Sequence, residues 1–253
     1  MPPPDATSGR PRVLGLYDGC VPSPALTATG VRLGMDLLPY VECMPLAPLP
    51  RLLLGPLEEW RLTLALAPEF SGFVELGHAM PEPPTHLWEE CLESAAAGGV
   101  AMLLTTASAY AHDVPCPFMA ALSRRFPAAS CLPAMEMALY EAVANAIIHG
   151  NLGIDSSLRS SAAGLREYRT TLARALADPM LAGRRLAVCC YPAGKALRLS
   201  VHDEGAGWDM KAQLATVASN ADKSGRGVDL IRQISAGMRT IDNGRQLVMD
   251  FIA

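Results

Sequence analysis

The sequence has 253 residues, of which half are hydrophobic, and carries a net charge of −4. This length suits one or two domains with sizeable cores, and without a block of like charges it does not indicate a nucleic-acid or an acidic-membrane partner. No apolar run approaches the roughly 18 residues of a membrane-spanning helix, and the seven scattered cysteines lack metal-site spacing, so we expect reduced thiols in a cytoplasmic protein.

The N-terminal half predicts an α/β domain. Residues 1–11 lack the apolar core of a signal peptide and are interpreted as a loose tail. Strand and helix patterns then alternate, which favours a parallel sheet over 12–128, while prolines between 39 and 56 interrupt regular structure. The predicted strands are 12–17, 61–67, the start of 72–83 and 99–107, and the predicted helices are 25–38, 85–97 and a helix that follows 114–118 and ends near 126.

The second half centres on a predicted helix over 135–150, which is rich in strong helix formers. Pro133 precedes this helix, and Gly150 suits a C-cap with positive φ. An amphipathic helix and several strands follow. They are the helix around 165–176, the hairpin of 185–192 and 197–203, a helix that starts near 228 and a last strand over 245–253.

Three polar side chains interrupt the apolar helix over 135–150. Glu141, Asn145 and His149 are spaced four apart, so they lie along one stripe of the helix surface. One interpretation is a half-buried helix with its polar edge in water. The other is a site that uses a carboxylate, a carboxamide and an imidazole in line.

Two glycine-containing turns follow in the sequence. HDEGAGWD begins at His202 after a strand-like run, so Asp203 projects from a sheet edge, and Gly205 and Gly207 allow positive φ. By itself this block could be a simple hairpin turn. SGRGVDLI begins at Ser224 and opens a helix, after a polar segment over 210–223 that we interpret as a lid. The helix, the D-x-G-x-G turn and the G-x-G turn together predict a nucleotide pocket.

In this order the three blocks resemble the N box and the two glycine boxes of the ATPase superfamily shared by histidine kinases, gyrase and Hsp90 (GHKL, HATPase_c). The residues of the three blocks are most similar to the motifs of the anti-sigma-factor serine kinases, which are E-A-x-x-N-A-x-x-H-G, D-x-G-x-G and S-G-x-G-x-x-[IL]. The resemblance covers about half the chain. It implies a two-layer α/β sandwich ATP-binding domain over 129–253, with helices on one face of a mixed sheet.

The resemblance also implies roles for individual residues. Glu141 would be the general base and Asn145 the ligand of Mg²⁺, while Asp203 would accept a hydrogen bond from adenine. His149 would lie near phosphate, or it could cap or pack the helix end. Backbone amides that glycine leaves uncovered at a helix N-terminus suit phosphate oxygens. The remaining expected contacts with ATP come from Gly205, Gly207, Lys223, Gly225, Arg226 and Gly227.

One position departs from the family pattern. The family's last strand usually begins with Gly-Thr, whose hydroxyl helps to hold adenine. Here Gly244 is followed by Arg245 and Gln246. Either side chain could substitute for the threonine, so this departure bears on the affinity for adenine.

The N-terminal half resembles a degraded response-regulator receiver. FVELGHAMP is similar to the receiver's phospho-acceptor segment, VAMLLTTA to its switch-threonine strand and VPCPF to its P-K-P-F segment. Gly77 replaces the acceptor aspartate, Cys116 replaces the lysine and Asp18 alone remains of the paired acids. The resemblance therefore implies a pseudo-receiver for docking or dimerisation, and the alternative is an unrelated α/β domain.

Three functions remain open. The first is an anti-sigma-type serine/threonine protein kinase that uses Mg-ATP, dimerises and sequesters a partner, such as an anti-sigma-factor antagonist or a sigma factor. The second is an ATP-gated adaptor that transfers no phosphate, and the third is a histidine-kinase catalytic domain acting in trans. Arginines over 159–185 form either a solvated face or a docking face for an acidic partner.

Overall fold

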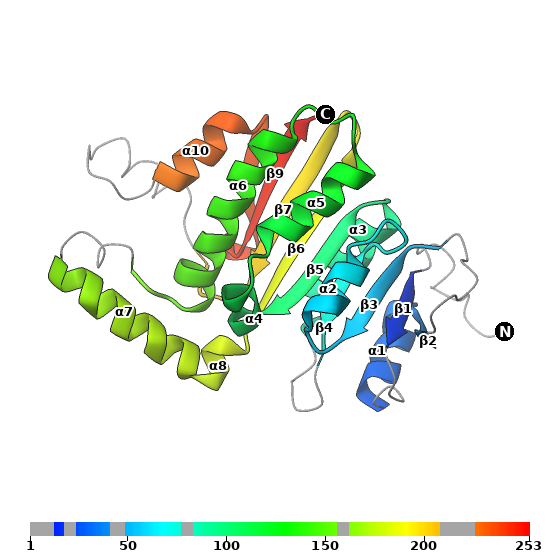
Figure 1. The fold of residues 1–253 in the computed structure, drawn as a ribbon, viewed down its shortest axis with the longest axis horizontal. Helices are drawn as coiled ribbons and strands as arrows, with labels where there is room; N and C mark the ends of the chain where they lie inside the picture. Colours follow the sequence, from blue (N-terminus) through cyan, green and yellow to red (C-terminus); the bar gives the residue numbers. More distant parts are fainter. Residues whose placement is uncertain (1–12, 18–23, 41–48, 77–82, 156–161, 208–225) are drawn as a thin grey trace.

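The structure is a computed structural model, and it describes residues 13–17, 24–40, 49–76, 83–155, 162–207 and 226–253. Its described strands form one nine-stranded sheet in the order β2-β1-β3-β4-β5-β6-β7-β9-β8, which runs through the whole molecule (Figure 1). The strands are β1 (Leu14–Tyr17), β2 (Asp36–Pro39), β3 (Arg51–Gly55), β4 (Gly72–Glu75), β5 (Val100–Thr105), β6 (Arg185–Ala193), β7 (Ala196–Asp203), β8 (Gly237–Ile241) and β9 (Gln246–Ile252).

The first five strands pair in parallel, so the predicted parallel sheet is confirmed. Parallel neighbours need crossover connections, and these contain α1 (Pro24–Leu33), α2 (Glu59–Ala65) and α3 (Thr85–Ala96). The order β2-β1-β3-β4-β5 is a common order of doubly wound α/β sheets.

The last four strands are antiparallel, and β6 joins them directly to β5. The predicted hairpin of β6 and β7 is confirmed. The proposed domain boundary at 128/129 lies between α5 (Pro115–Arg125) and α6 (Leu132–Asn145). Both helices contribute to one hydrophobic cluster that also includes strands from each half, so a shared sheet and core connect the two predicted domains.

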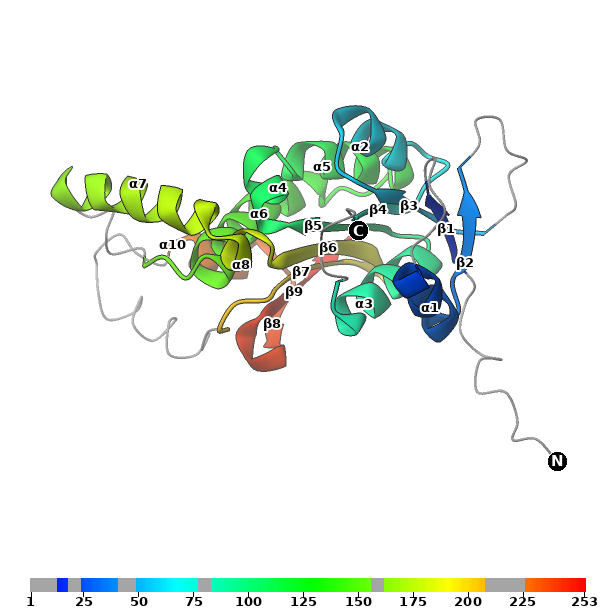
Figure 2. The same cartoon turned by 90° about the horizontal axis from the view of Figure 1, so that it is seen from below.

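Helices cover both faces of the sheet (Figure 2). α2, α5 and α6 lie on one face, and α1 and α3 lie on the other. β5 is buried along its whole length: Met102 and Leu104 join the cluster under α5 and α6, whereas Ala101 and Leu103 join the cluster under α3. The other helical segments are α4 (Thr106–Ala111), η1 (Ala146–Asn151), α7 (Ala162–Ala177), α8 (Pro179–Ala182), α10 (Arg226–Ile234) and η3 (Asp242–Gly244).

Some predicted elements are wrong in type. The segment 61–67 is not a strand, because α2 buries Leu62 and Ala65 at helical spacing. A strand, β3, lies among the prolines, where a short apolar run is buried in the sheet. The segment 114–118 does not precede the helix, because residues 115–118 are the start of α5. The helix predicted over 25–38 ends at Leu33 and is followed by β2, and β8 has no counterpart in the prediction.

The amphipathic helix around 165–176 is confirmed as part of α7. Its partly buried Tyr168, Leu172 and Leu176 pack on the main core. Arg184 and Arg185 are not part of the predicted basic face. Arg184 donates a hydrogen bond to the backbone of Asn151, and Arg185 is buried. Within the described ranges, every helix is too short or too polar to cross a bilayer.

Candidate functional site

The polar stripe lies on α6 and η1, which together form a helical segment that ends at Asn151, one residue past the predicted end. After Asn145 the backbone changes from α-helix to the π-helix η1, which runs to Asn151. The predicted C-cap with positive φ at Gly150 is therefore wrong, and the left-handed residue is Gly153, with φ +63°. Short π-helical segments within α-helices are frequent at functional sites.

Gly150 is required by close packing rather than by its backbone angle. A Cβ atom added to Gly150 would lie 2.5 Å from Oδ1 of Asp203. A Cβ atom on Gly205 would lie 2.2 Å from the carbonyl oxygen of Gly150. The helix end and the D-x-G-x-G turn, which are separated by α7 and β6 in the sequence, therefore meet.

Asp203 ends β7 and is 5% exposed. Its Oδ1 accepts a hydrogen bond of 2.8 Å from the amide of Gly205. Burial raises the pKa of this carboxyl group to about 6, against the opposing effects of that amide and of nearby His202, Arg245 and Arg184. A buried carboxylate of this kind can accept a hydrogen bond from a ligand.

The raised pKa of Asp203 is expected to make the ligand-free protein less stable as the pH rises from about 4 to about 6. The folded protein holds this proton up to a pKa of about 6, whereas the unfolded chain releases it near 3.8. The folded state thus binds more protons in this window, so stability falls with rising pH, by about 3 kcal/mol in total. Urea unfolding of wild type and Asp203→Asn across the window measures this difference.

The matched control is Asp229→Asn, because Asp229 is an aspartate whose pKa is lowered by Arg232. The free energy of unfolding of wild type, relative to that of Asp229→Asn, should therefore not fall between about pH 4 and 6. A pH-independent difference between wild type and Asp203→Asn would mean that Asp203 titrates at its ordinary pKa.

Of the two glycines in the turn, only Gly207 has the predicted positive φ, at +78°. A Cβ atom there would also lie 2.2 Å from the carbonyl oxygen of Asn243. Gly205 is outside the left-handed region, and its small size serves the contact with Gly150 instead. The prediction for Gly205 is therefore corrected from backbone freedom to close approach.

Glu141 reaches the start of α10. A Cβ atom on Gly227 would lie 2.1 Å from Oε2 of Glu141, so the glycine leaves room for this carboxylate at the helix N-terminus. The first and last sequence blocks thus meet in space. Lys223 and Gly225 lie outside the described residues, as does the lid segment over 210–223, and the side chain of Arg226 is likewise not described.

Asn145 and His149 follow Glu141 along the same helical segment. Asn145 is half-buried, and His149 is exposed. The Nδ1 atom of His149 donates a hydrogen bond of 2.5 Å to the carbonyl oxygen of Ile154. This bond fits the capping interpretation of His149 and leaves Nε2 for another partner.

Asn151 organises the site but was not identified from the sequence. It is fully buried. Its Nδ2 atom donates to Oγ1 of Thr106 at 2.8 Å and to the carbonyl oxygen of Arg185 at 3.0 Å. Its Oδ1 atom accepts a 2.7 Å bond from the amide of Glu204, the residue after Asp203. Asn151 thereby ties the end of η1 to the D-x-G-x-G turn.

The two residues that could replace the family's threonine have other partners. The Nε2 atom of Gln246 donates to Oε1 of Glu90 at 2.8 Å, on the α3 face of the sheet. Arg245 forms an ion pair of 2.7 Å with Asp242. Neither of these side-chain contacts is with Asp203.

These contacts suit a nucleotide bound with a divalent metal. The glycines at 150, 205, 207 and 227 let neighbouring segments approach to within 2.1–2.5 Å of where a Cβ atom would lie. Backbone amides at the N-terminus of a helix suit phosphate oxygens. Asn145 offers a neutral oxygen of the kind that Mg²⁺ accepts, while Asp203 offers a buried acceptor.

A family model described as the histidine kinase-like ATPase domain matches residues 104–251, more than half of the chain. The match contains all three sequence blocks and begins at the end of β5. No curated protein matches the chain.

Proposed function

Since the chain belongs to the histidine kinase-like ATPase family, we propose that this ATP-binding regulatory protein is a protein kinase of the anti-sigma-factor type. In this proposal it transfers a phosphoryl group from Mg-ATP to a serine or threonine of a partner protein. The partner is an anti-sigma-factor antagonist, a sigma factor or another signalling protein. The kinase forms a homodimer and sequesters this partner.

The observation that carries the proposal is the position of Glu141. Its carboxylate lies against Gly227 at the start of α10, where phosphate oxygens are expected, and Asn145 follows one turn later on the same helix. A carboxylate beside the transferred phosphate can take the proton from an attacking hydroxyl. Such base catalysis contributes roughly 10²- to 10⁴-fold to a rate.

The other residues bind rather than react. Asp203 accepts the hydrogen bond from the exocyclic amine of adenine, and Gly205 and Gly207 bring the backbone close to the base. Asn145 would hold Mg²⁺, which neutralises phosphate charge when bound. Lys223, Gly225, Arg226 and Gly227 would hold the phosphates, and His149 would add its Nε2 atom beside them.

The second candidate is an ATP-gated adaptor without phosphoryl transfer. The contacts of Arg245 and Gln246 favour it, because neither side chain supplies the hydroxyl that helps to hold adenine in the family. A histidine-kinase catalytic domain acting in trans is the third. Acid treatment of a labelled partner separates it from the first, since phosphohistidine is acid-labile and phosphoserine is not.

Titration calorimetry with Mg-ATP and Mg-GTP tests the pocket. We expect wild type to bind Mg-ATP in preference to Mg-GTP. Asp203→Ala should bind roughly 10- to 100-fold more weakly, because a hydrogen bond to a charged group contributes about 1.5–3 kcal/mol. Glu141→Ala should bind as wild type does.

The control is Asp250→Ala, which removes a half-buried carboxylate of β9 that pairs with Arg198 and Arg239. Its affinity for Mg-ATP should be unchanged. If wild type binds no nucleotide, or if Asp203→Ala binds as tightly as wild type, the proposed pocket is wrong.

For the N-terminal half we propose a pseudo-receiver that docks or dimerises. Its support is the order β2-β1-β3-β4-β5, which receivers of the CheY type share. Gly77 and Asp18 lie outside the described residues, and Cys116 lies in the first turn of α5. Glu75 ends β4, and Thr105 and Ser108 donate hydrogen bonds to its carboxylate.

A further inference from the structure

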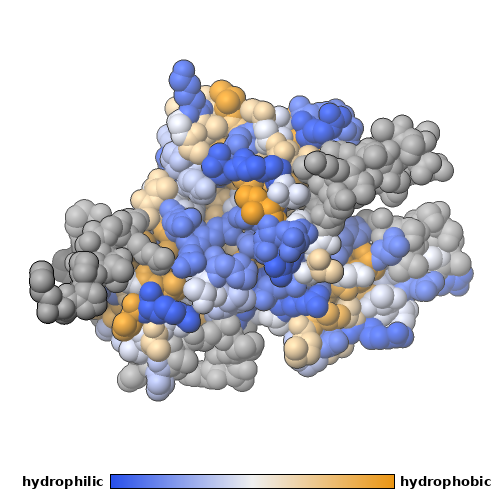
Figure 3. All heavy atoms as spheres, turned by 180° about the vertical axis from the view of Figure 1, so that it is seen from behind, coloured by the Kyte–Doolittle hydropathy of each residue, from blue (hydrophilic) through white to orange (hydrophobic). Residues whose placement is uncertain are grey.

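A polar hollow lies on the sheet face that carries α3, opposite the side of α6. Figure 3 shows hydrophilic side chains gathered across this face. The hollow has a volume of about 520 Å³. Its lining residues are His86, Glu89, Glu90, Glu93, His202, Asp242, Arg245 and Gln246.

We propose that His86, His202 and Asp242 in this hollow bind a divalent transition-metal cation of the Zn²⁺ class. One ligand atom from each of the three residues lies within 4.8 Å of the others. Two imidazoles and a carboxylate suit Zn²⁺ and its neighbours better than Mg²⁺ or Ca²⁺, which prefer oxygen. This site is separate from the Mg²⁺ that accompanies ATP.

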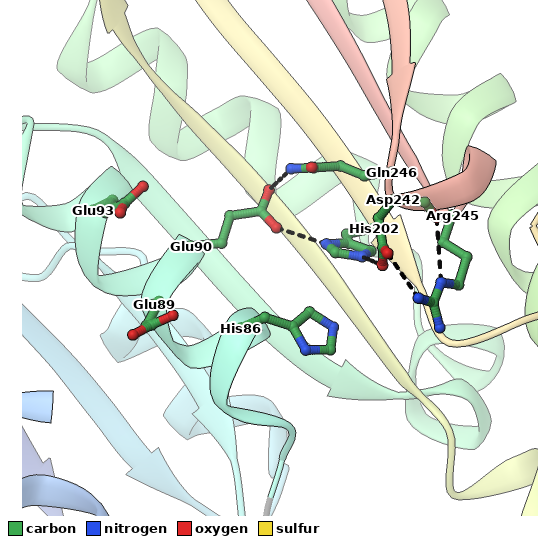
Figure 4. Close-up of a pocket in the computed structure, with 8 residues that line it drawn as sticks. All are labelled: His86, Glu89, Glu90, Glu93, His202, Asp242, Arg245 and Gln246. Atoms are coloured by element: carbon green, nitrogen blue, oxygen red, sulfur yellow. Dashed lines mark hydrogen bonds and ion pairs between the residues drawn. The ribbon is translucent and has the colours of Figure 1, made fainter. Parts of the chain in front are cut away.

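The separation of the ligand atoms requires only a small closure. With metal–ligand distances of about 2.0–2.2 Å, tetrahedral ligands are about 3.3–3.6 Å apart. His202 and Asp242 are close to this separation, since Nε2 lies 3.1 Å from Oδ2 and would have to move apart slightly. His86 is the exposed member, and its ring points toward His202 from α3 (Figure 4). A rotation of the His86 side chain would complete the set of three ligands.

His202 is oriented as a metal ligand usually is. It is 4% exposed, and its Nδ1 lies 3.0 Å from Oε2 of Glu90. With its proton on Nδ1, the ring donates to Glu90 and presents Nε2 to the cation, which is the carboxylate–histidine–metal arrangement. Figure 4 shows Glu90 held in turn by Gln246, whose Nε2 atom donates to Oε1.

The third ligand comes from a turn with a left-handed backbone. Asp242 has φ +51° and Asn243 has φ +55°, a region that aspartate and asparagine adopt more readily than other non-glycine residues. Arg245 binds Oδ1 of Asp242, so Oδ2 is directed at His202. The turn therefore places a carboxylate oxygen of Asp242 in the hollow, beside His202.

The charge of the hollow suits a cation. His86 is the second residue of α3, where the helix dipole disfavours positive charge. The carboxylates of Glu89, Glu90 and Glu93 lie on the same helix and line the same hollow, so they offset the dipole. The alternative without a metal is a protonated His202 that bridges Glu90 and Asp242.

The cation site adjoins the nucleotide pocket through the backbone. His202 precedes Asp203, and the amide of Asp203 donates to the carbonyl oxygen of Arg245 at 3.0 Å. The carbonyl oxygen of Asn243 lies against Gly207. Cation binding is therefore expected to change the affinity for ATP, and this consequence alone rests on the proposed function.

The test is titration of the EDTA-treated full chain with Zn²⁺, and with Co²⁺ to record its visible absorption. We expect one cation per chain and no competition from excess Mg²⁺. His86→Gln and Asp242→Asn should each weaken binding at least tenfold, and Glu90→Gln should weaken it about 10- to 100-fold, as loss of an outer carboxylate does. No nucleotide is needed, so the result is independent of the ATP proposal.

The matched control is His112→Gln, which removes an exposed histidine at the end of α4. This variant should bind Zn²⁺ as wild type does. Because His86 is exposed, its replacement should leave the fold intact and keep the test decisive. The proposal is wrong if no cation binds, if His86→Gln binds with wild-type affinity, or if Co²⁺ shows thiolate absorption that Cys116→Ser and Cys131→Ser remove.

Discussion

Replacement of Glu141 by glutamine is expected to lower phosphoryl transfer roughly 10²- to 10⁴-fold, the range that general bases contribute. Glutamine keeps the size of the side chain beside Gly227 but cannot accept the proton of the attacking hydroxyl. The Kd for Mg-ATP should stay the same, because in the proposed pocket the binding contacts come from Asp203 and the glycine-lined backbone. The measurement is single-turnover transfer from labelled ATP to a partner, with basal hydrolysis as a second readout.

Glu136→Gln is the control for this variant. Glu136 is an exposed glutamate on the same helix, and its loss should change neither the rate nor the Kd. Wild-type turnover in Glu141→Gln would remove the base from the proposed mechanism. Loss of ATP binding in the same variant would instead assign Glu141 to binding.

Asn151→Asp is expected to destabilise the protein by at least about 2 kcal/mol. The substitution keeps the shape but replaces the amide that donates to Thr106 and Arg185 with an oxygen. The buried acceptors then lose their donor, and each buried group left unpaired costs about 1–3 kcal/mol. For a chain of this size the Tm should fall by at least about 4–8 °C, which calorimetry measures.

The control is Asn243→Asp, at an exposed position with φ +55° that aspartate also tolerates. Its Tm should change little. The hydrogen bond from the amide of Glu204, beside Asp203, should survive in Asn151→Asp, because aspartate keeps an oxygen that accepts it. A variant with unchanged Tm would show that the Asn151 bonds contribute nothing net to stability.

The local elements of the ATPase half were predictable. Residues 135–145 carry helix formers with apolar side chains four apart, and these side chains are buried as expected. The alternation of Leu197, Leu199 and Val201 marked β7, and Asp203 ends it. Such patterns depend on neighbours within a few residues, which is why they can be found without a structure.

The same local rules failed where packing decided the outcome. The alternation of leucines over 61–67 suggested a strand, yet α2 forms because Leu62 and Ala65 face the core. At Gly150 and Gly205 the sequence suggested positive φ, whereas the structure shows two backbones that touch. Glycine meets both needs, so its presence alone could not distinguish them.

The sequence by itself determined the family resemblance, the order of the three blocks and the residues expected to bind ATP, because each block is a short segment with its own local geometry. Only the tertiary structure decided that one sheet joins the two halves, that Asn151 supports the site, and that His86 lies beside His202. The reason is distance along the chain: Glu90 and His202 are 112 residues apart, and no local pattern encodes which strand brings them together.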